Sequence, residues 1–164
     1  MKRHKDFWQV TEDSLDKSMK TFNIDSSMKN ELLNLYKVLS TFKEVPETLK
    51  ILKEKNFKLA ILSNGTPSLL NELVKSNELD DLFDDLFSIE EVGIYKPDSK
   101  VYDLPIKKYK IKKNEVIFLS ANTWDVSGGG NYGYNSIWVN RSNNIFDNLD
   151  FKPQTEIKNL SELI

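Results

Sequence analysis

The sequence contains no cysteine among its 164 residues. This absence excludes disulfide bonds, thiol catalysis and metal sites built from thiolates, and it favours the cytoplasm. No apolar run approaches the length that crosses a bilayer, and the basic N-terminus leads into no apolar core of a signal peptide. The sequence therefore predicts a cytoplasmic protein that does not span a membrane.

An excess of one charge is also lacking, because 23 basic residues are interspersed with 25 acidic ones. This balance leaves no electrostatic footprint for nucleic acid or an anionic membrane surface. The chain has no internal repeat and no low-complexity tract. Its length and its 39% apolar content are those of one compact globular domain.

Apolar runs alternate with helical patterns through most of the chain, which predicts βαβ units and a parallel sheet. Helices are predicted to begin near Pro46, at Pro67 and after Asp98. The predicted strands are residues 57–62, 86–89, 116–119 and 136–139.

The N-terminal part predicts two helices within residues 11–39, with Thr11 and either Ser26 or Ser27 as N-caps. The second helix has an apolar stripe that predicts a buried face, formed by Leu32, Leu35, Tyr36 and Leu39. Because composition changes near residue 42, we expect a helical segment over residues 1–42 and an α/β segment over residues 43–164.

Three polar clusters adjoin the predicted strands and helices, where an open α/β sheet presents its functional groups. They are Leu62-Ser63-Asn64-Gly65, then Tyr95-Lys96-Pro97-Asp98 with Tyr102, and Ser120-Ala121-Asn122-Thr123-Trp124-Asp125. Each has a purely structural alternative. The first can be a strand-to-helix turn, Lys96 can be a surface lysine, and Asn122 or Asp125 can cap the next helix.

Together the three clusters resemble the (S)-2-haloacid dehalogenases of the haloacid dehalogenase superfamily, from about Phe7 to the C-terminus. Further matching segments are Glu44-Val45-Pro46 and Trp138-Val139-Asn140-Arg141. The resemblance implies an α/β fold, with a Rossmannoid parallel sheet flanked by helices and part of a helical cap.

The resemblance also implies roles for individual residues. In that family an N-terminal Asp displaces halide from a small 2-haloacid, and water hydrolyses the resulting ester. Ser63 and Asn64 would hold the substrate carboxylate, and Lys96 would pair with the nucleophile. Asp125 would help to activate water. Tyr102, Ser120 and Asn122 would support this arrangement, and Trp124 and Phe7 would line an apolar pocket.

Magnesium-dependent phosphatases of the same superfamily are an alternative. They carry Gly-Asp-Ser where this chain has Ser120-Ala121-Asn122. Ala121 therefore stands where a carboxylate ligand of magnesium would be, and a hard cation needs that oxygen. The sequence thus favours chemistry without a metal or other cofactor.

The sequence departs from the family at its start, where a strand ending in Asp-x-x-Gly-Thr should precede the cap. Asp6, Asp13 and Asp16 lie in polar sequence that is predicted to be helical, and Arg3 is too loosely placed to bind halide. We therefore expect an absent first, central strand and no dehalogenation by this chain alone. A truncated remnant or a non-catalytic anion-binding module is the alternative function.

Two local features conflict with the predicted helices. Pro105 falls inside the helix that follows Asp98, at a cost of about 3 kcal/mol. Gly128-Gly129-Gly130 weakens the next helix by roughly 1 kcal/mol per glycine relative to alanine. Such conflicts are expected of a truncated remnant of a longer enzyme. Separately, strand edges left unpaired by the absent strand predict a homodimer.

Overall fold

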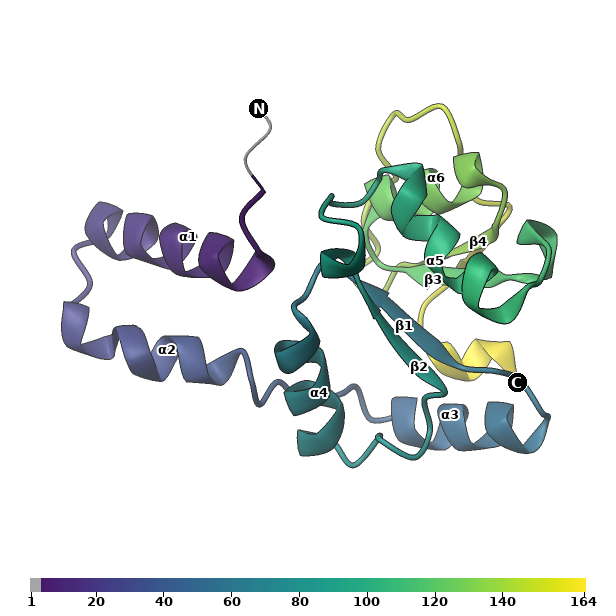
Figure 1. The fold of residues 1–164 in the computed structure, drawn as a ribbon, viewed down its shortest axis with the longest axis horizontal. Coiled ribbons are helices and arrows are strands. Elements are labelled where there is room, and N and C mark those ends of the chain that lie inside the picture. The colour runs from purple at the N-terminus through teal and green to yellow at the C-terminus, as the bar shows by residue number, and fades with distance from the viewer. Residues whose placement is uncertain (1–3) are drawn as a thin grey trace. The chain divides into compact units, whose positions relative to one another are not determined.

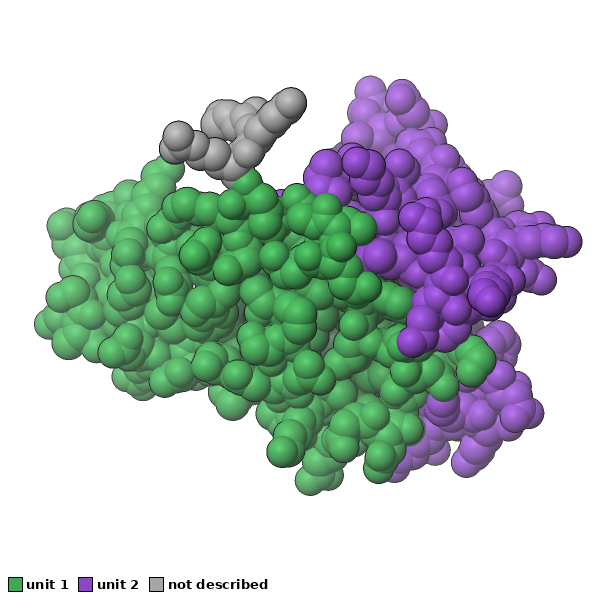
Figure 2. All heavy atoms as spheres, in the orientation of Figure 1, with its two compact units in different colours: residues 1–42, 58–93 green, residues 43–57, 94–164 purple. Residues whose placement is uncertain are grey.

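A computed structural model describes residues 4–164 of the chain. Arg3, considered above for halide binding, lies outside these residues. The described chain divides into two compact units (Figure 2). Unit 1 comprises residues up to Phe42 together with residues 58–93, and unit 2 comprises residues 43–57 and 94–164. A unit boundary thus follows Phe42, whereas the division into a cap and a core stays a prediction.

The first helix of unit 1, α1, spans Phe7–Thr21 (Figure 1). Asp6 caps it, because its carboxylate accepts a hydrogen bond from the Gln9 backbone N–H at 2.8 Å. The predicted cap at Thr11 is wrong. The Thr11 hydroxyl lies inside the helix and donates to the Phe7 carbonyl at 2.8 Å, one turn earlier.

The second helical segment consists of a 3₁₀ turn, Ser26–Met28, and helix α2, Lys29–Leu35. Asp25 rather than either predicted serine caps the turn, since its carboxylate accepts from the Ser27 N–H at 2.8 Å. The predicted buried stripe is also wrong. Leu33 is the buried residue of α2, whereas Leu35, Tyr36 and Leu39 are exposed.

The remaining part of unit 1 is a strand–helix–strand unit. Strand β1, Ala60–Ser63, pairs in parallel with β2, Asp85–Ser88. Helix α4, Pro67–Ser76, connects them and contacts β2. As predicted, α4 begins at Pro67, and the preceding Thr66 caps it.

Unit 2 contains a second parallel sheet, in the order β3-β4-β5. Its strands are Ile117–Ser120, Asn135–Val139 and Thr155–Ile157. The sequence did not predict β5, because its Thr155 and Glu156 are exposed and leave no apolar run. Ile157 packs into the core.

Three α-helices belong to unit 2: α3 (Val45–Glu54), α5 (Ser99–Tyr109) and α6 (Thr123–Tyr132). Helix α6 packs on β3 and β4 and also contacts α5. Pro46 lies in the first turn of α3 and Asp98 caps α5, as the sequence predicted. The predicted α/β class with parallel sheets flanked by helices is therefore confirmed. Within residues 4–164 no helix is both long and apolar enough to cross a bilayer.

The glycine run of α6 has a packing reason. A Cβ on Gly129 would lie 2.6 Å from the Phe118 ring, and a Cβ on Gly130 would overlap the Phe151 ring. Real Cβ atoms do not approach neighbours this closely, so only glycine lets the α6 backbone lie against these rings. The run is therefore a requirement of close packing, and the interpretation of it as a conflict with the fold is wrong.

Candidate active site

The first predicted cluster forms the turn between β1 and α4. Ser63 ends β1, and its hydroxyl accepts a hydrogen bond from the Gly65 N–H at 3.0 Å. Ser88, at the paired position on β2, donates its hydroxyl to the Gly65 carbonyl at 2.7 Å. Gly65 is thus held on both sides, and this fixes the turn in which Asn64 lies.

The second and third clusters meet in a buried ion pair within unit 2. The Lys96 Nζ lies 3.0 Å from Asp125 Oδ2, and each side chain is 7% exposed. The Tyr102 hydroxyl donates to the other oxygen, Asp125 Oδ1, at 2.8 Å. The Asp125 carboxylate therefore has one cation and one neutral donor as partners.

Burial shifts the pKa of both partners of Asp125. Burial lowers the pKa of Lys96, and the charge and hydrogen bond of Asp125 partly oppose that shift. Burial and the neighbouring Asp125 charge raise the pKa of Tyr102 far above its usual value. Tyr102 therefore stays protonated and acts as a hydrogen-bond donor.

Asp125 lies in the first turn of α6, where the N–H groups at the helix start favour a negative charge. The Lys96 Nζ also lies 5.1 Å from the centroid of the Phe118 ring, on the adjacent strand β3. A cation over an aromatic face is stabilised electrostatically when it is removed from water. The ammonium group is therefore held by both a carboxylate and a ring.

Tyr102 is fully buried and belongs to a cluster of aromatic rings. Phe118, Tyr132 and Tyr134 lie 5.7 to 6.1 Å from its ring centroid. The Tyr134 hydroxyl donates to the Tyr102 carbonyl. Gly128 closes the other side, because a Cβ there would lie 2.5 Å from the Tyr102 hydroxyl oxygen and 2.8 Å from Pro97 Cβ.

The remaining residues of the third cluster follow β3. Asn122 occupies the N-cap position of α6, but its side chain makes no capping hydrogen bond. The alternative in which Asn122 caps the helix is therefore wrong, and its amide is not used to satisfy the helix start. Its backbone N–H donates to the Ser120 hydroxyl at 3.2 Å.

The two predicted pocket residues are in different units. Phe7 is the first residue of α1 and is partly buried, and Trp124 in α6 is 39% exposed. Their shared role in lining a pocket stays a prediction. Across residues 4–164 there is no group of three or more His, Asp or Glu side chains placed to bind a metal ion.

Sequence reasoning did not identify Ser88 or Gly128. Ser88 was assigned only to a strand, although a serine at the C-terminal end of a parallel strand is a usable signal. The signal for Gly128 was its unfavourable helix propensity. A glycine inside a helix is costly, and its presence there indicates that another side chain packs closely against the helix backbone.

Comparison with known proteins identifies the family of the chain. A family model described as haloacid dehalogenase-like hydrolase matches residues 3–139. The chain belongs to this family. An (S)-2-haloacid dehalogenase from Pseudomonas sp. (strain CBS-3) is 37% identical over 166 aligned residues, which cover 99% of this chain and 73% of that protein.

Solved structures of dehalogenases share the fold of this haloacid dehalogenase-like hydrolase. An L-2-haloacid dehalogenase crystal structure is 31% identical with a TM-score of 0.95, over 99% of this chain and 72% of the other. The enzyme from Xanthobacter autotrophicus with chloropropionic acid covalently bound is 27% identical. Its TM-score is 0.87, over 98% of this chain and 75% of that one.

The substitution Asp125→Asn tests the electrostatics of the ion pair. It leaves the Lys96 charge buried without its anion, so we expect the pKa of Lys96 to fall further and the free energy of unfolding to drop by about 3 to 5 kcal/mol near neutral pH. The unfolded chain then binds the Lys96 proton more tightly than the folded one, so this deficit shrinks as the pH rises through the folded-state pKa.

Urea unfolding of the parent and variant at several pH values between about 7 and 10 measures this deficit. Asp13→Asn is the matched control, because Asp13 pairs with Lys5 in an exposed ion pair. It should cost about 1 kcal/mol or less at every pH. A deficit for Asp125→Asn that does not change with pH would contradict the predicted coupling to Lys96.

Gly128→Ala tests the close approach of α6 to Tyr102. Overpacking against the phenol and Pro97 should lower the free energy of unfolding by about 1 to 3 kcal/mol, despite the better helix propensity of alanine. Asn131→Ala, at an exposed position of the same helix, should change it by about 0.5 kcal/mol or less.

The same substitution in a Tyr102→Phe background separates the two contacts. Removing the phenol oxygen relieves the nearer contact, so Gly128→Ala should cost at least about 0.5 kcal/mol less there. Equal costs in both backgrounds would show that the phenol is not what excludes a Cβ.

Proposed function

We propose that this chain carries the substrate-binding and supporting residues of an (S)-2-haloacid dehalogenase. The observation that carries the proposal is the buried arrangement of Lys96, Asp125 and Tyr102, in a chain similar along its whole length to such enzymes. The substrate is a small 2-haloacid or a similar small carboxylate. Ser63 and Asn64 bind its carboxylate, and Trp124 and Phe7 contact its apolar part.

The reaction proceeds in two steps. An aspartate carboxylate attacks the halogen-bearing carbon, forms an ester and releases halide. A water molecule activated by Asp125 then attacks the ester carbonyl, which releases the 2-hydroxy acid and regenerates the aspartate. The covalently bound chloropropionic acid in the Xanthobacter autotrophicus enzyme supports an ester intermediate.

Lys96 has a cationic group suited to pairing with the attacking aspartate and to stabilising the charge that develops around it. Its own ion pair with Asp125 is mostly shielded from water, which strengthens such interactions. Three further residues support this arrangement. Tyr102 donates its hydroxyl to Asp125, and Ser120 accepts a hydrogen bond from the Asn122 N–H.

The attacking aspartate is the missing part of the proposal. The printed sequence contains no Asp-x-x-Gly-Thr motif. Asp6 caps α1, while Asp13 and Asp16 lie within it. Strands β1 and β3 each have a single strand partner among the described residues, which leaves an edge of each sheet to accept a further strand. We therefore propose that a segment other than these 164 residues supplies the nucleophile.

Halide release from (S)-2-chloropropionate tests the proposal. The 164-residue chain alone should release no chloride, because it has no attacking carboxylate, and a version extended by an N-terminal strand ending in Asp-x-x-Gly-Thr should release it. The matched control carries Asn in place of that Asp. No chloride from the extended chain, or equal release from the control, would contradict the proposal.

Activity assays of the same extended chain distinguish a dehalogenase from the alternative, a magnesium-dependent phosphatase. A dehalogenase of this kind keeps its activity in a metal chelator and does not hydrolyse a phosphate monoester. Chelator-sensitive phosphate release by the extended chain would favour the phosphatase. A non-catalytic anion-binding module would instead bind the carboxylate without releasing halide.

We also propose that the chain works in the cytoplasm, with residues 1–42 as its cap and residues 43–164 as its core.

A third proposal is that the chain forms a homodimer. Exposed apolar side chains on and after α2 support a self-association surface, among them Leu35, Val38 and Leu39. Leu39→Glu should then shift the mass measured by light scattering from dimer to monomer. Ile145→Glu, at a position that is 93% exposed, should leave it unchanged. A monomeric parent would contradict the proposal.

A further inference from the structure

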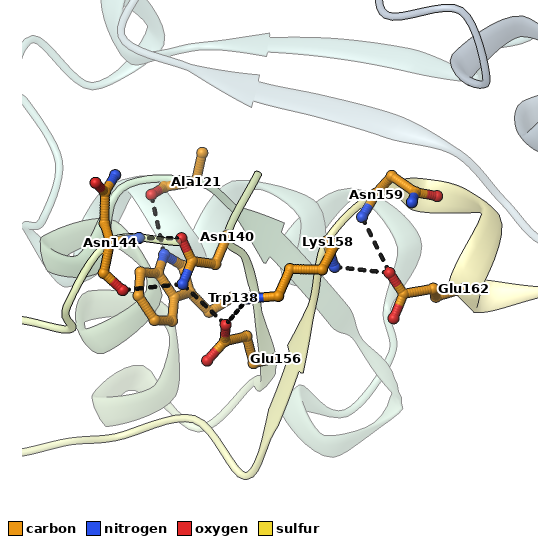
Figure 3. Close-up of polar contacts among 8 residues, drawn as sticks. All are labelled: Ala121, Trp138, Asn140, Asn144, Glu156, Lys158, Asn159 and Glu162. Carbon is orange, nitrogen blue, oxygen red and sulfur yellow. Dashed lines mark hydrogen bonds and ion pairs between the residues drawn. The ribbon is translucent and has the colours of Figure 1, made fainter. Parts of the chain in front are cut away.

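Trp138 belongs to the Trp138-Val139-Asn140-Arg141 motif, which has no role in the proposed reaction. It lies on β4, paired with Ser120 of β3, and is 4% exposed. Its indole N–H donates to the carbonyl of Ala121 at 3.1 Å (Figure 3). The acceptor therefore belongs to the residue between Ser120 and Asn122.

The end of β4 is fixed by the side chain of Asn140, which is 4% exposed. Its amide NH₂ donates to the Asn144 carbonyl at 3.0 Å and to Glu156 Oε1 at 2.8 Å, and its oxygen accepts from the Asn144 N–H at 2.8 Å (Figure 3). The buried Asn140 amide thus makes three hydrogen bonds, which connect residues 140 and 144 with β5.

The residues that follow Asn144 contact Trp138 and the turn between β3 and α6. Phe146 packs its ring edge-on against the Trp138 ring, with centroids 5.1 Å apart and planes at 85°. The next residue, Asp147, accepts a hydrogen bond from the Thr123 hydroxyl. Ala121 and Thr123, on either side of Asn122, are therefore both held by residues that follow them in the sequence.

These contacts explain how Asn122 can sit at an N-cap position without capping the helix. An Asn at that position commonly fixes the turn by bonding to the first N–H groups of the helix. Here the Trp138 indole and Asp147 fix the turn instead, so the Asn122 amide is not used for that purpose.

We propose that Trp138 is a positioning residue for the reaction described above, acting through the Ala121 carbonyl on Ser120 and Asn122. This role rests on the proposed function. Whether Trp138 fixes the turn before α6 can be measured independently of any enzymatic activity. The indole does not contact substrate. It sets the direction of the Ala121–Asn122 peptide, which lies between the side chains of the two site residues.

Hydrogen exchange of the three tryptophan indole groups in the 164-residue chain tests the contact. The Trp138 N–H is buried and bonded, whereas Trp124 is 39% exposed. We expect the Trp138 indole N–H to exchange at least about 10-fold more slowly than that of Trp124, because exchange requires the bond to open. Equal rates would overturn the proposal.

The variant Trp138→Phe removes the donor but keeps a ring to pack on Phe146. Because Ala121 is exposed, its carbonyl can bond to water in the variant, and the chain should stay folded. We expect NMR shifts of the amides of residues 120–123 to change. Trp8→Phe is the matched control and should leave these amides unshifted. Unchanged amides in folded Trp138→Phe would overturn the proposal.

Halide release by the chain extended with the Asp-bearing strand tests the effect on the reaction. Trp138→Phe should lower kcat about 10-fold, but less than about 2-fold when Asn122→Ala is already present, because both changes act on the same group. Trp8→Phe should leave kcat unchanged. An equal loss in both backgrounds would show a merely structural role and overturn the proposal. If the extended parent releases no halide, the proposed function fails, while indole exchange and amide shifts still decide whether Trp138 holds the turn.

Discussion

The buried contact of Asp125 with Lys96 and Tyr102 is the interaction on which the rest of unit 2 depends. Two charges removed from water are tolerated only when each has good partners. Each carboxylate oxygen has a donor, the start of α6 favours the negative charge, and the Phe118 ring faces the ammonium group. Residues from two helices, a strand and a loop must therefore keep fixed positions around one carboxylate.

That requirement explains features of unit 2 that are unfavourable when considered alone. Three glycines weaken α6 by propensity, but they let its backbone lie against Tyr102, Phe118 and Phe151. Pro105 lies inside α5, the helix that carries Tyr102, and is buried there. Local cost in these helices accompanies close packing around the carboxylate, as is common near functional sites.

The fold followed largely from sequence patterns, because apolar runs and turn residues act over short distances. Pro46, Pro67 and Asp98 occupy the helix starts at which they were expected. Among the wrong predictions are helix N-caps, where several nearby polar residues could each accept the capping hydrogen bond. Asp6 rather than Thr11 caps α1, and Asp25 rather than Ser26 caps the following turn, because an oxygen caps only when it reaches the free N–H groups.

The amino-acid sequence was enough to indicate an α/β protein with parallel strands and the position of three polar clusters. Those properties depend on composition and on spacing along the chain. The three-dimensional arrangement was needed to show that Lys96, Tyr102 and Asp125 meet, that Gly128 leaves room for the phenol, and that the Trp138 indole donates to the Ala121 carbonyl. Each of those depends on distances between residues far apart in sequence, which helix and strand periodicity does not specify.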